Sequence, residues 1–145
     1  MIALGGQALR RAHDAGNRPL QVVSAWASEA RLVLAQRAVP DKSNELSALP
    51  EVLAMLAVEG CIVTIDATGA HADIADLITA KGADYMLALK GNQGRMEEDV
   101  QALFSDAEGS AYAGIAHIYD RDVNGGHGRV EIRETWAITD PSCLR

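Results

Sequence analysis

One carboxylate stands where an α/β protein would place its chemistry. Asp66 directly follows residues 61–65, a continuous apolar run that is typical of a strand buried on both faces. Open α/β sheets bind their ligands at the carboxyl ends of such strands, so Asp66 could bind a metal ion. Asp66 also precedes Ala67-Thr68-Gly69, and aspartate commonly caps the N-terminus of a helix. From position alone, the sequence supports metal binding and helix capping equally.

A second group of polar residues suits phosphate. Lys90 and Asn92 follow the next predicted strand, residues 84–89, so they would lie at the same edge of the sheet. Ammonium and amide groups can bind phosphate oxygens. Lys42 and Asn44 form a similar pair in front of a predicted helix. An exposed loop or a polar turn would explain each pair without any ligand.

A third group alternates along a predicted strand. His127, Arg129, Glu131 and Arg133 are spaced by two residues, so on a strand their side chains point to one face. They could bind a phosphate or pair among themselves. The alternative is the solvated face of a hairpin, which four polar residues would equally form.

The hydrophobic pattern indicates the elements that position these groups. Three β-like runs joined by short turns predict an antiparallel meander over residues 2–9, 20–26 and 31–39. Pro50 suits the first turn of a helix, and one face of that helix carries Leu49, Val52, Leu53 and Leu56. This pattern predicts a helix packed on a sheet.

Strands and helices then alternate. Strands are predicted at 61–65 and 84–89, with a helix between them that ends at a left-handed Gly82, which implies a right-handed parallel crossover. A third helix is predicted around 96–104, followed by strands over 112–123 and 129–139 that are joined by a hairpin loop at 124–128. The predicted fold class is therefore α/β, a mixed sheet with three antiparallel strands and then parallel strands with helices.

Composition limits the class of protein. With 145 residues, 48% hydrophobic and 23% charged, the chain is predicted to form one compact domain over 1–145. No apolar run approaches the length of a membrane span, so we expect no membrane partner and a cytoplasmic location. The net charge of −7 argues against a free-standing nucleic-acid binder, because phosphate binding needs clustered Lys and Arg.

Taken together and in order, several segments closely resemble one family. It is the DDE transposases of bacterial insertion sequences, in the group of the H-repeat-associated proteins. The resemblance is carried by residues 2–10, Lys42-Ser43-Asn44-Glu45, and residues 63–67, 82–85, 87–93 and 127–133.

This resemblance implies a ribonuclease H-like fold with an inserted β-hairpin near the C-terminus, and DNA transposition as the activity. It implies that Asp66 is a catalytic metal ligand, and that DNA at insertion-sequence ends contacts Lys42, Asn44, Lys90, Asn92, His127 and Arg129. In the family mechanism, two Asp and one Glu hold two Mg²⁺ or Mn²⁺ ions about 3.5–4 Å apart for attack on a DNA phosphodiester.

The chain departs from the family pattern at two acids. The first strand of the family typically contains I-D-G-K, whereas the matching residues here are Leu4-Gly5-Gly6-Gln7, so the first acid is Gly5. The third acid belongs to a tryptophan-rich helix that has no counterpart before Arg145. Glu131 could be proposed in its place, but alternation puts it on the inserted hairpin. We therefore expect weak metal binding.

Two functional hypotheses follow. The first is a truncated, degenerate transposase that has lost DNA strand cleavage and transfer. The alternative is a non-catalytic regulatory fragment that binds DNA ends, a full-length transposase subunit or a second copy of itself. A nucleotide-binding domain is poorly supported, because the chain has neither a dinucleotide-binding glycine motif after its first strand nor a P-loop.

Overall fold

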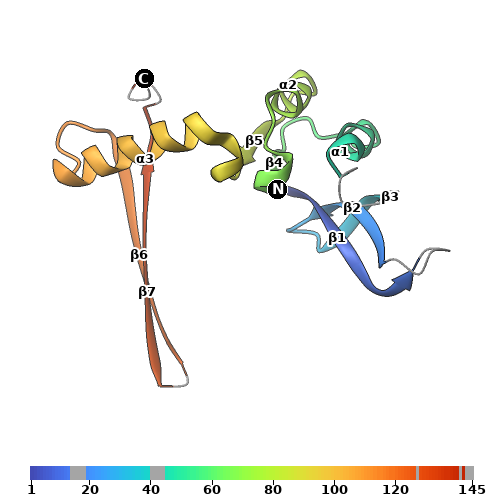
Figure 1. The fold of residues 1–145 in the computed structure, drawn as a ribbon, viewed down its shortest axis with the longest axis horizontal. Helices are drawn as coiled ribbons and strands as arrows, with labels where there is room; N and C mark the ends of the chain where they lie inside the picture. Colours follow the sequence, from blue (N-terminus) through green and yellow to red (C-terminus); the bar gives the residue numbers. More distant parts are fainter. Residues whose placement is uncertain (14–18, 40–44, 127, 141, 143–145) are drawn as a thin grey trace. The chain divides into compact units, whose positions relative to one another are not determined.

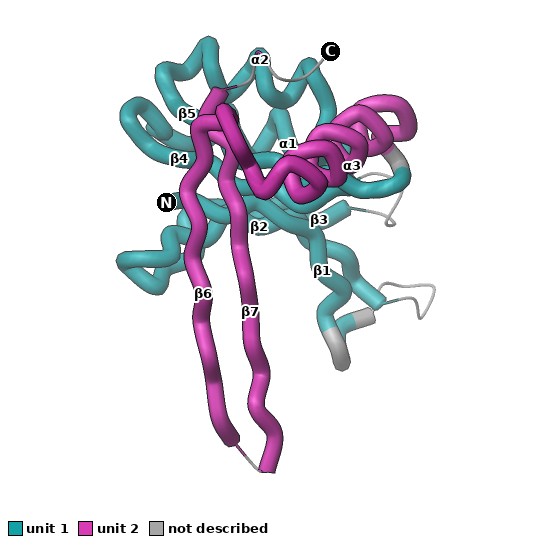
Figure 2. The backbone as a smooth tube through the Cα atoms, turned by 90° about the vertical axis from the view of Figure 1, so that its left-hand side faces the viewer, with its two compact units in different colours: residues 1–92 teal, residues 93–145 magenta. Residues whose placement is uncertain are grey.

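The computed structural model describes residues 1–13, 19–39, 45–126, 128–140 and 142, except the side chains of residues 10, 11, 13 and 92. The chain divides into two compact units, residues 1–92 (unit 1) and 93–145 (unit 2), which Figure 2 colours separately. The expected single domain over 1–145 stays a prediction. No helix among the described residues is long and apolar enough to cross a membrane.

Unit 1 contains a five-stranded mixed sheet in the order β3-β2-β1-β4-β5 (Figure 1). Antiparallel pairing joins β1 to β2 and β2 to β3, and parallel pairing joins β1 to β4 and β4 to β5. The predicted mixed sheet of the ribonuclease H-like type is therefore confirmed. The strands are β1 (Ile2–His13), β2 (Pro19–Ala27), β3 (Leu32–Val39), β4 (Ile62–Ile65) and β5 (Asp84–Leu87).

Helix α1 (Glu45–Ala54) begins earlier than the sequence pattern predicted. Pro50 lies inside this helix, so its placement in the first turn is wrong. The helix tolerates the lost backbone hydrogen bond because a buried stripe fixes it to the sheet. That stripe has the spacing i, i+3, i+4, i+7 and i+8, and it consists of Glu45, Ala48, Leu49, Val52 and Leu53.

The core of unit 1 lies on one face of the sheet. Helix α1 packs on β2 and β3, and α2 (Ala72–Ala80) packs on β5 and α1. No described helix of unit 1 covers the other face, where one row of paired residues crosses all five strands. That row contains Val33 (49% exposed), Trp26 (40%), Ala3, Thr64 and Met86 (64%).

A glycine ends α2 as predicted. Gly82 has a φ of 72°, and its backbone N–H donates to Thr79 O at 2.9 Å. Its own carbonyl accepts from the N–H of Gly60 at 2.8 Å, which ties the turn before β5 to the turn before β4. The left-handed backbone and this close approach together favour glycine here.

Unit 2 consists of α3 (Gly94–Gly109) and a hairpin of β6 (His117–Gly126) and β7 (Arg129–Ile138), preceded by a short 3-10 turn at Gly91–Gln93. The predicted hairpin near the C-terminus is confirmed. The prediction that its first strand begins at residue 112 is wrong, because Ala111 and Tyr112 have positive φ and form a turn. The predicted loop over 124–128 is also too long, since pairing continues to Gly126 and Arg129.

Aromatic stacking joins the hairpin to the end of α3. The ring centroids of Tyr112 and Trp136 lie 5.9 Å apart, and the two rings are nearly parallel. The ring centroid of Tyr119 lies 5.0 Å from that of Trp136, so the three rings form an aromatic cluster. The Tyr112 hydroxyl is buried and has no hydrogen-bond partner in the described part of the chain. Burial, and then the nearby carboxylate of Glu108, raise the pKa of Tyr112 above its usual value.

Replacing Gly82 with alanine is expected to destabilise unit 1 by about 1–2 kcal/mol, the cost of a left-handed non-glycine residue. An added Cβ would also lie 3.2 Å from Glu59 Cγ. Urea unfolding followed by Trp26 fluorescence in a Trp136→Phe background measures the change. Gly5→Ala is the control, because a Cβ there meets nothing within 4 Å and φ is not positive. Equal stability of the two variants would contradict the role of Gly82.

Replacing Trp136 with alanine is expected to destabilise the hairpin by about 1–3 kcal/mol, since each aromatic pair contributes about 0.5–1.5 kcal/mol beyond its buried area. Amide hydrogen exchange in β6 and β7, measured by NMR, should accelerate accordingly. Val130→Ala is the control, because Val130 is 73% exposed and should change exchange little. Similar exchange in both variants would show that the aromatic cluster does not hold the hairpin.

Candidate functional site

The pairing of β1 with β4 places Gly5 and Asp66 at one edge of the sheet. The two strands are parallel, and the last pair in their register is Leu4 with Ile65. Gly5, inside β1, and Asp66, which directly follows β4, are each the next residue, so they lie side by side on neighbouring strands. This is the position that the sequence predicted for the first two acids of the site, with glycine in place of the first.

Asp66 caps a short helix. Its backbone is extended, and its Oδ1 accepts a hydrogen bond from the N–H of Thr68 at 3.2 Å, at the start of the 3-10 helix η2 (Ala67–Gly69). The side chain is exposed, and no described residue bonds its second carboxylate oxygen. Capping therefore occupies one oxygen and leaves the other available. Metal binding by Asp66 stays a prediction.

Glu45 is a functional candidate that our interpretation of the sequence did not single out. It is 9% exposed and is the one buried charged residue among those described. Its carboxylate lies against Gly6 of β1, and it lines a small cavity of about 10 Å³ together with Gly5 and Asp66. The signal was present in the sequence, because Glu45 falls four residues before Leu49 on the apolar stripe of α1.

Lys90 lies on the other side of Asp66. It follows β5, is exposed, and lines an open hollow of about 420 Å³ with Asp66, Thr68 and Gly91. The structure thus brings an ammonium group and a carboxylate to one hollow at this edge. The predicted phosphate contacts Lys42, Asn44 and His127, and the side chain of Asn92, lie outside the described residues.

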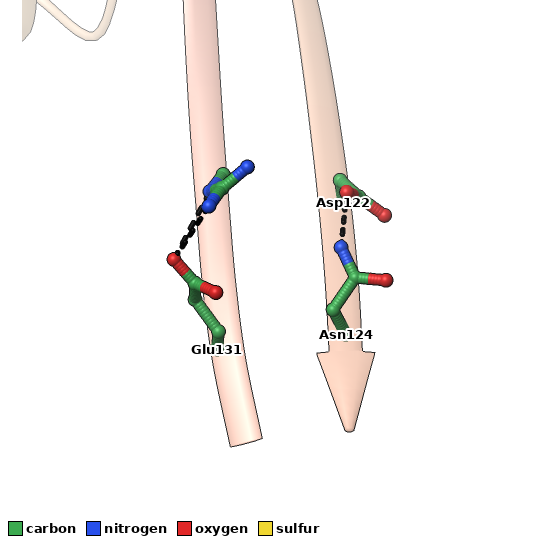
Figure 3. A network of polar contacts seen from close by, with 4 residues as sticks. Asp122, Asn124 and Glu131 are labelled. Carbon is green, nitrogen blue, oxygen red and sulfur yellow. Dashed lines mark hydrogen bonds and ion pairs between the residues drawn. The ribbon is translucent and has the colours of Figure 1, made fainter. Parts of the chain in front are cut away.

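Arg129 and Glu131 belong to unit 2. On β7, Arg133 donates from Nε and Nη2 to Glu131 Oε1, at 3.1 and 2.8 Å. On β6, Asn124 donates to Asp122, and Figure 3 shows this pair beside Glu131. Arg129 is exposed in a hollow beside Asn124 and Glu131. The sequence analysis left open that the polar side chains on this face of the hairpin pair with one another, and the ion pair of Glu131 with Arg133 is such a pair. The role of Glu131 as a third acid stays a prediction.

The oxygen donors at the edge of unit 1 fit a hard divalent cation. Mg²⁺ binds carboxylate oxygens, keeps several waters and needs only one or two protein carboxylates. Asp66 and Glu45 could supply these, and such an ion would polarise a phosphate oxygen. The described residues contain no cluster of three or more metal-ligating side chains. The donors present thus fit one ion and fall short of the three-carboxylate set of a two-ion site.

Comparisons with known proteins agree on one family. The family model of the transposase DDE domain matches residues 5–142. The chain is 40% identical over 137 residues to an uncharacterised protein of the dhlA 3' region of Xanthobacter autotrophicus, covering 93% of this chain and 45% of that protein. It is 38% identical over 140 residues to the H repeat-associated putative transposase YhhI of Escherichia coli, covering 92% of this chain and 35% of that protein.

A second relative in Escherichia coli, the putative transposase YncI, is 38% identical over 135 residues, with 92% of this chain and 53% of that protein covered. Among solved structures, the chain is similar to a piggyBac transposase synaptic complex with hairpin DNA, at a TM-score of 0.46 and 7% identity over 83% of this chain and 28% of that chain. The chain spans about a third to a half of the length of these curated relatives.

Placing aspartate at position 5 is expected to strengthen Mn²⁺ binding about tenfold, which corresponds to about 1.4 kcal/mol from one added carboxylate contact. The side chain fits, because a Cβ on Gly5 meets nothing within 4 Å. Titration calorimetry of Gly5→Asp against Gly5→Asn separates the added charge from the added bulk. Equal Mn²⁺ affinity in both variants would show that position 5 does not face the metal-binding edge.

Proposed function

This chain belongs to the DDE transposase family, and from that premise we propose that it binds DNA ends of an insertion sequence without carrying out strand transfer. The single observation that supports the loss of chemistry is Gly5. It stands beside Asp66 in the parallel register of β1 and β4, where the family resemblance implies the first metal-binding aspartate.

The loss of this carboxylate removes more than one contact. Two divalent ions close together repel each other, and the negative charge of their ligands offsets that repulsion. With glycine at position 5, fewer carboxylates remain at the edge, so the family's two-ion chemistry is expected to fail rather than to slow. The chain would then be a degenerate copy that keeps the fold of a transposase.

Local positive charge supports DNA as the partner. Lys90 is exposed in the hollow beside Asp66, where a phosphate could contact the ammonium group. Arg129 is exposed on the hairpin of unit 2. Because the net charge is −7, such contacts would be few and sensitive to salt.

A regulatory role is the second candidate function. Unit 2 exposes apolar side chains on one face of its hairpin, including Val123, Val130 and Ile132, which could contact another transposase subunit. A chain that occupied DNA ends or joined an active subunit without reacting would interfere with transposition. Co-purification with a full-length homologue tests this regulatory role. If the two proteins do not co-purify, the regulatory role by subunit contact is refuted, and DNA-end binding by this chain alone remains as the proposed function.

Lys90→Ala is expected to weaken binding to insertion-sequence end DNA and to lower the salt dependence by about one released counterion. Fluorescence anisotropy at several salt concentrations measures both. Lys81→Ala is the matched control, because Lys81 precedes β5 whereas Lys90 follows it, at the opposite end of the strand. Equal losses in both variants would indicate non-specific attraction.

Strand-nicking assays with Mg²⁺ and Mn²⁺ on the same DNA test the claim that the chain does not cleave DNA. We expect no cleavage by the unmodified chain. Clear cleavage that Asp66→Ala abolishes would refute the claim of inactivity, while absent DNA binding at low salt would refute the claim of DNA-end recognition.

A further inference from the structure

We propose that Glu45 and Asp66 together bind one divalent cation, with Glu45 acting as a metal ligand from the first turn of α1. The inference rests on the proposed function in placing the site at the Asp66 edge, and it adds a ligand that the family resemblance does not assign. The probe ion is Mn²⁺, which stands in for Mg²⁺.

The burial of Glu45 is the first argument. It occupies the apolar stripe of α1, a position where a hydrophobic residue would stabilise the fold. Its side chain is 9% exposed, and no hydrogen bond or ion pair joins its carboxylate to another described residue. With no described partner and no place among the buried, unbonded polar atoms, the carboxylate oxygens of Glu45 stay open to water or to a cation that binds carboxylates.

The glycine at position 6 is the second argument. A Cβ on Gly6 would lie closer than 3.0 Å to three atoms of the Glu45 carboxyl group. Gly6 does not have a positive φ, so its backbone does not require glycine, and glycine in a strand weakens the strand. The absence of a side chain at position 6 instead makes room for the carboxylate. Gly6 thus weakens β1 and leaves space for the carboxylate of Glu45.

The cavity is the third argument. Glu45 and Asp66 line the same cavity of about 10 Å³, roughly the volume needed for one water molecule or one small ion. Thr68 holds one oxygen of Asp66 and leaves the second free of described partners. No lysine, arginine or histidine is among the described residues that line the cavity. Two carboxylates and water are a common ligand set for Mg²⁺.

Glu45→Gln tests the proposal with a side chain of the same shape. We expect Mn²⁺ affinity to fall at least about tenfold by titration calorimetry, in line with losses at metal-site residues. We also expect the Mn²⁺-induced rise in melting temperature to disappear. The melting temperature in EDTA should stay about the same, because the substitution breaks no hydrogen bond or ion pair to a described residue. Glu51→Gln is the control, since Glu51 is an exposed acid on the same helix that pairs with Arg37 at 2.8 Å.

A purely structural Glu45 predicts the opposite pattern. Glu45→Gln would then lower the melting temperature in EDTA and keep both the Mn²⁺ affinity and the Mn²⁺-induced stabilisation, and that result would overturn the proposal. Asp66→Asn should lose Mn²⁺ affinity as Glu45→Gln does. Unchanged affinity in Asp66→Asn would also overturn the two-ligand site.

Two glycine variants keep the proposal testable if Glu45→Gln does not fold. Gly6→Ala retains both carboxylates but displaces that of Glu45, so it should weaken Mn²⁺ binding. Gly109→Ala, in unit 2, adds a Cβ that meets nothing within 4 Å and should bind Mn²⁺ normally. Equal Mn²⁺ affinity in both variants would refute the role of Glu45. DNA-end binding by Lys90→Ala is measured without metal, so failure of the metal site and failure of the proposed function are distinguishable.

Discussion

The parallel pairing of β1 with β4 is the constraint on which the candidate site depends. This pairing places Gly5, inside β1, beside Asp66, which follows the end of β4, with Leu4 opposite Ile65. A slip of one residue would turn Ile2 and Leu4 from the core to the uncovered face. The hydrophobic core therefore fixes the register, and the register in turn fixes which residues stand beside Asp66.

Gly5 and Gly6 are adjacent in β1, but their surroundings differ. Gly5 pairs with Ser24 and has open space around it, so nothing in unit 1 requires glycine there. Gly6 pairs with the fully buried Val23 and faces the carboxyl group of Glu45 from α1. Gly5 is therefore small without a structural need in unit 1, whereas Gly6 is small because a neighbouring carboxyl group occupies the space.

Much of the fold could be predicted from the sequence, because hydrophobic periodicity reports burial directly. The strand before Asp66 and the left-handed Gly82 were predicted correctly, but the expected burial of that strand on both faces is wrong, because Ile62 is 46% exposed. Pro50 was misplaced, since tertiary packing of the α1 stripe outweighed a local preference of proline for first turns. Glu45 was missed as a site residue because the helix was expected to begin near Pro50, which left Glu45 in the polar turn before it.

The row of apolar side chains across the sheet, from Val33 through Trp26 to Met86, has a consequence for how the chain behaves in concentrated solution. Exposed apolar side chains attract similar surfaces, and the net charge of −7 keeps molecules apart at neutral pH. Toward pH 5.0, where the chain approaches its isoelectric point, that repulsion vanishes. The colloidal behaviour of the protein is then governed by hydrophobic attraction, and crystallisation or purification near that pH would favour aggregates.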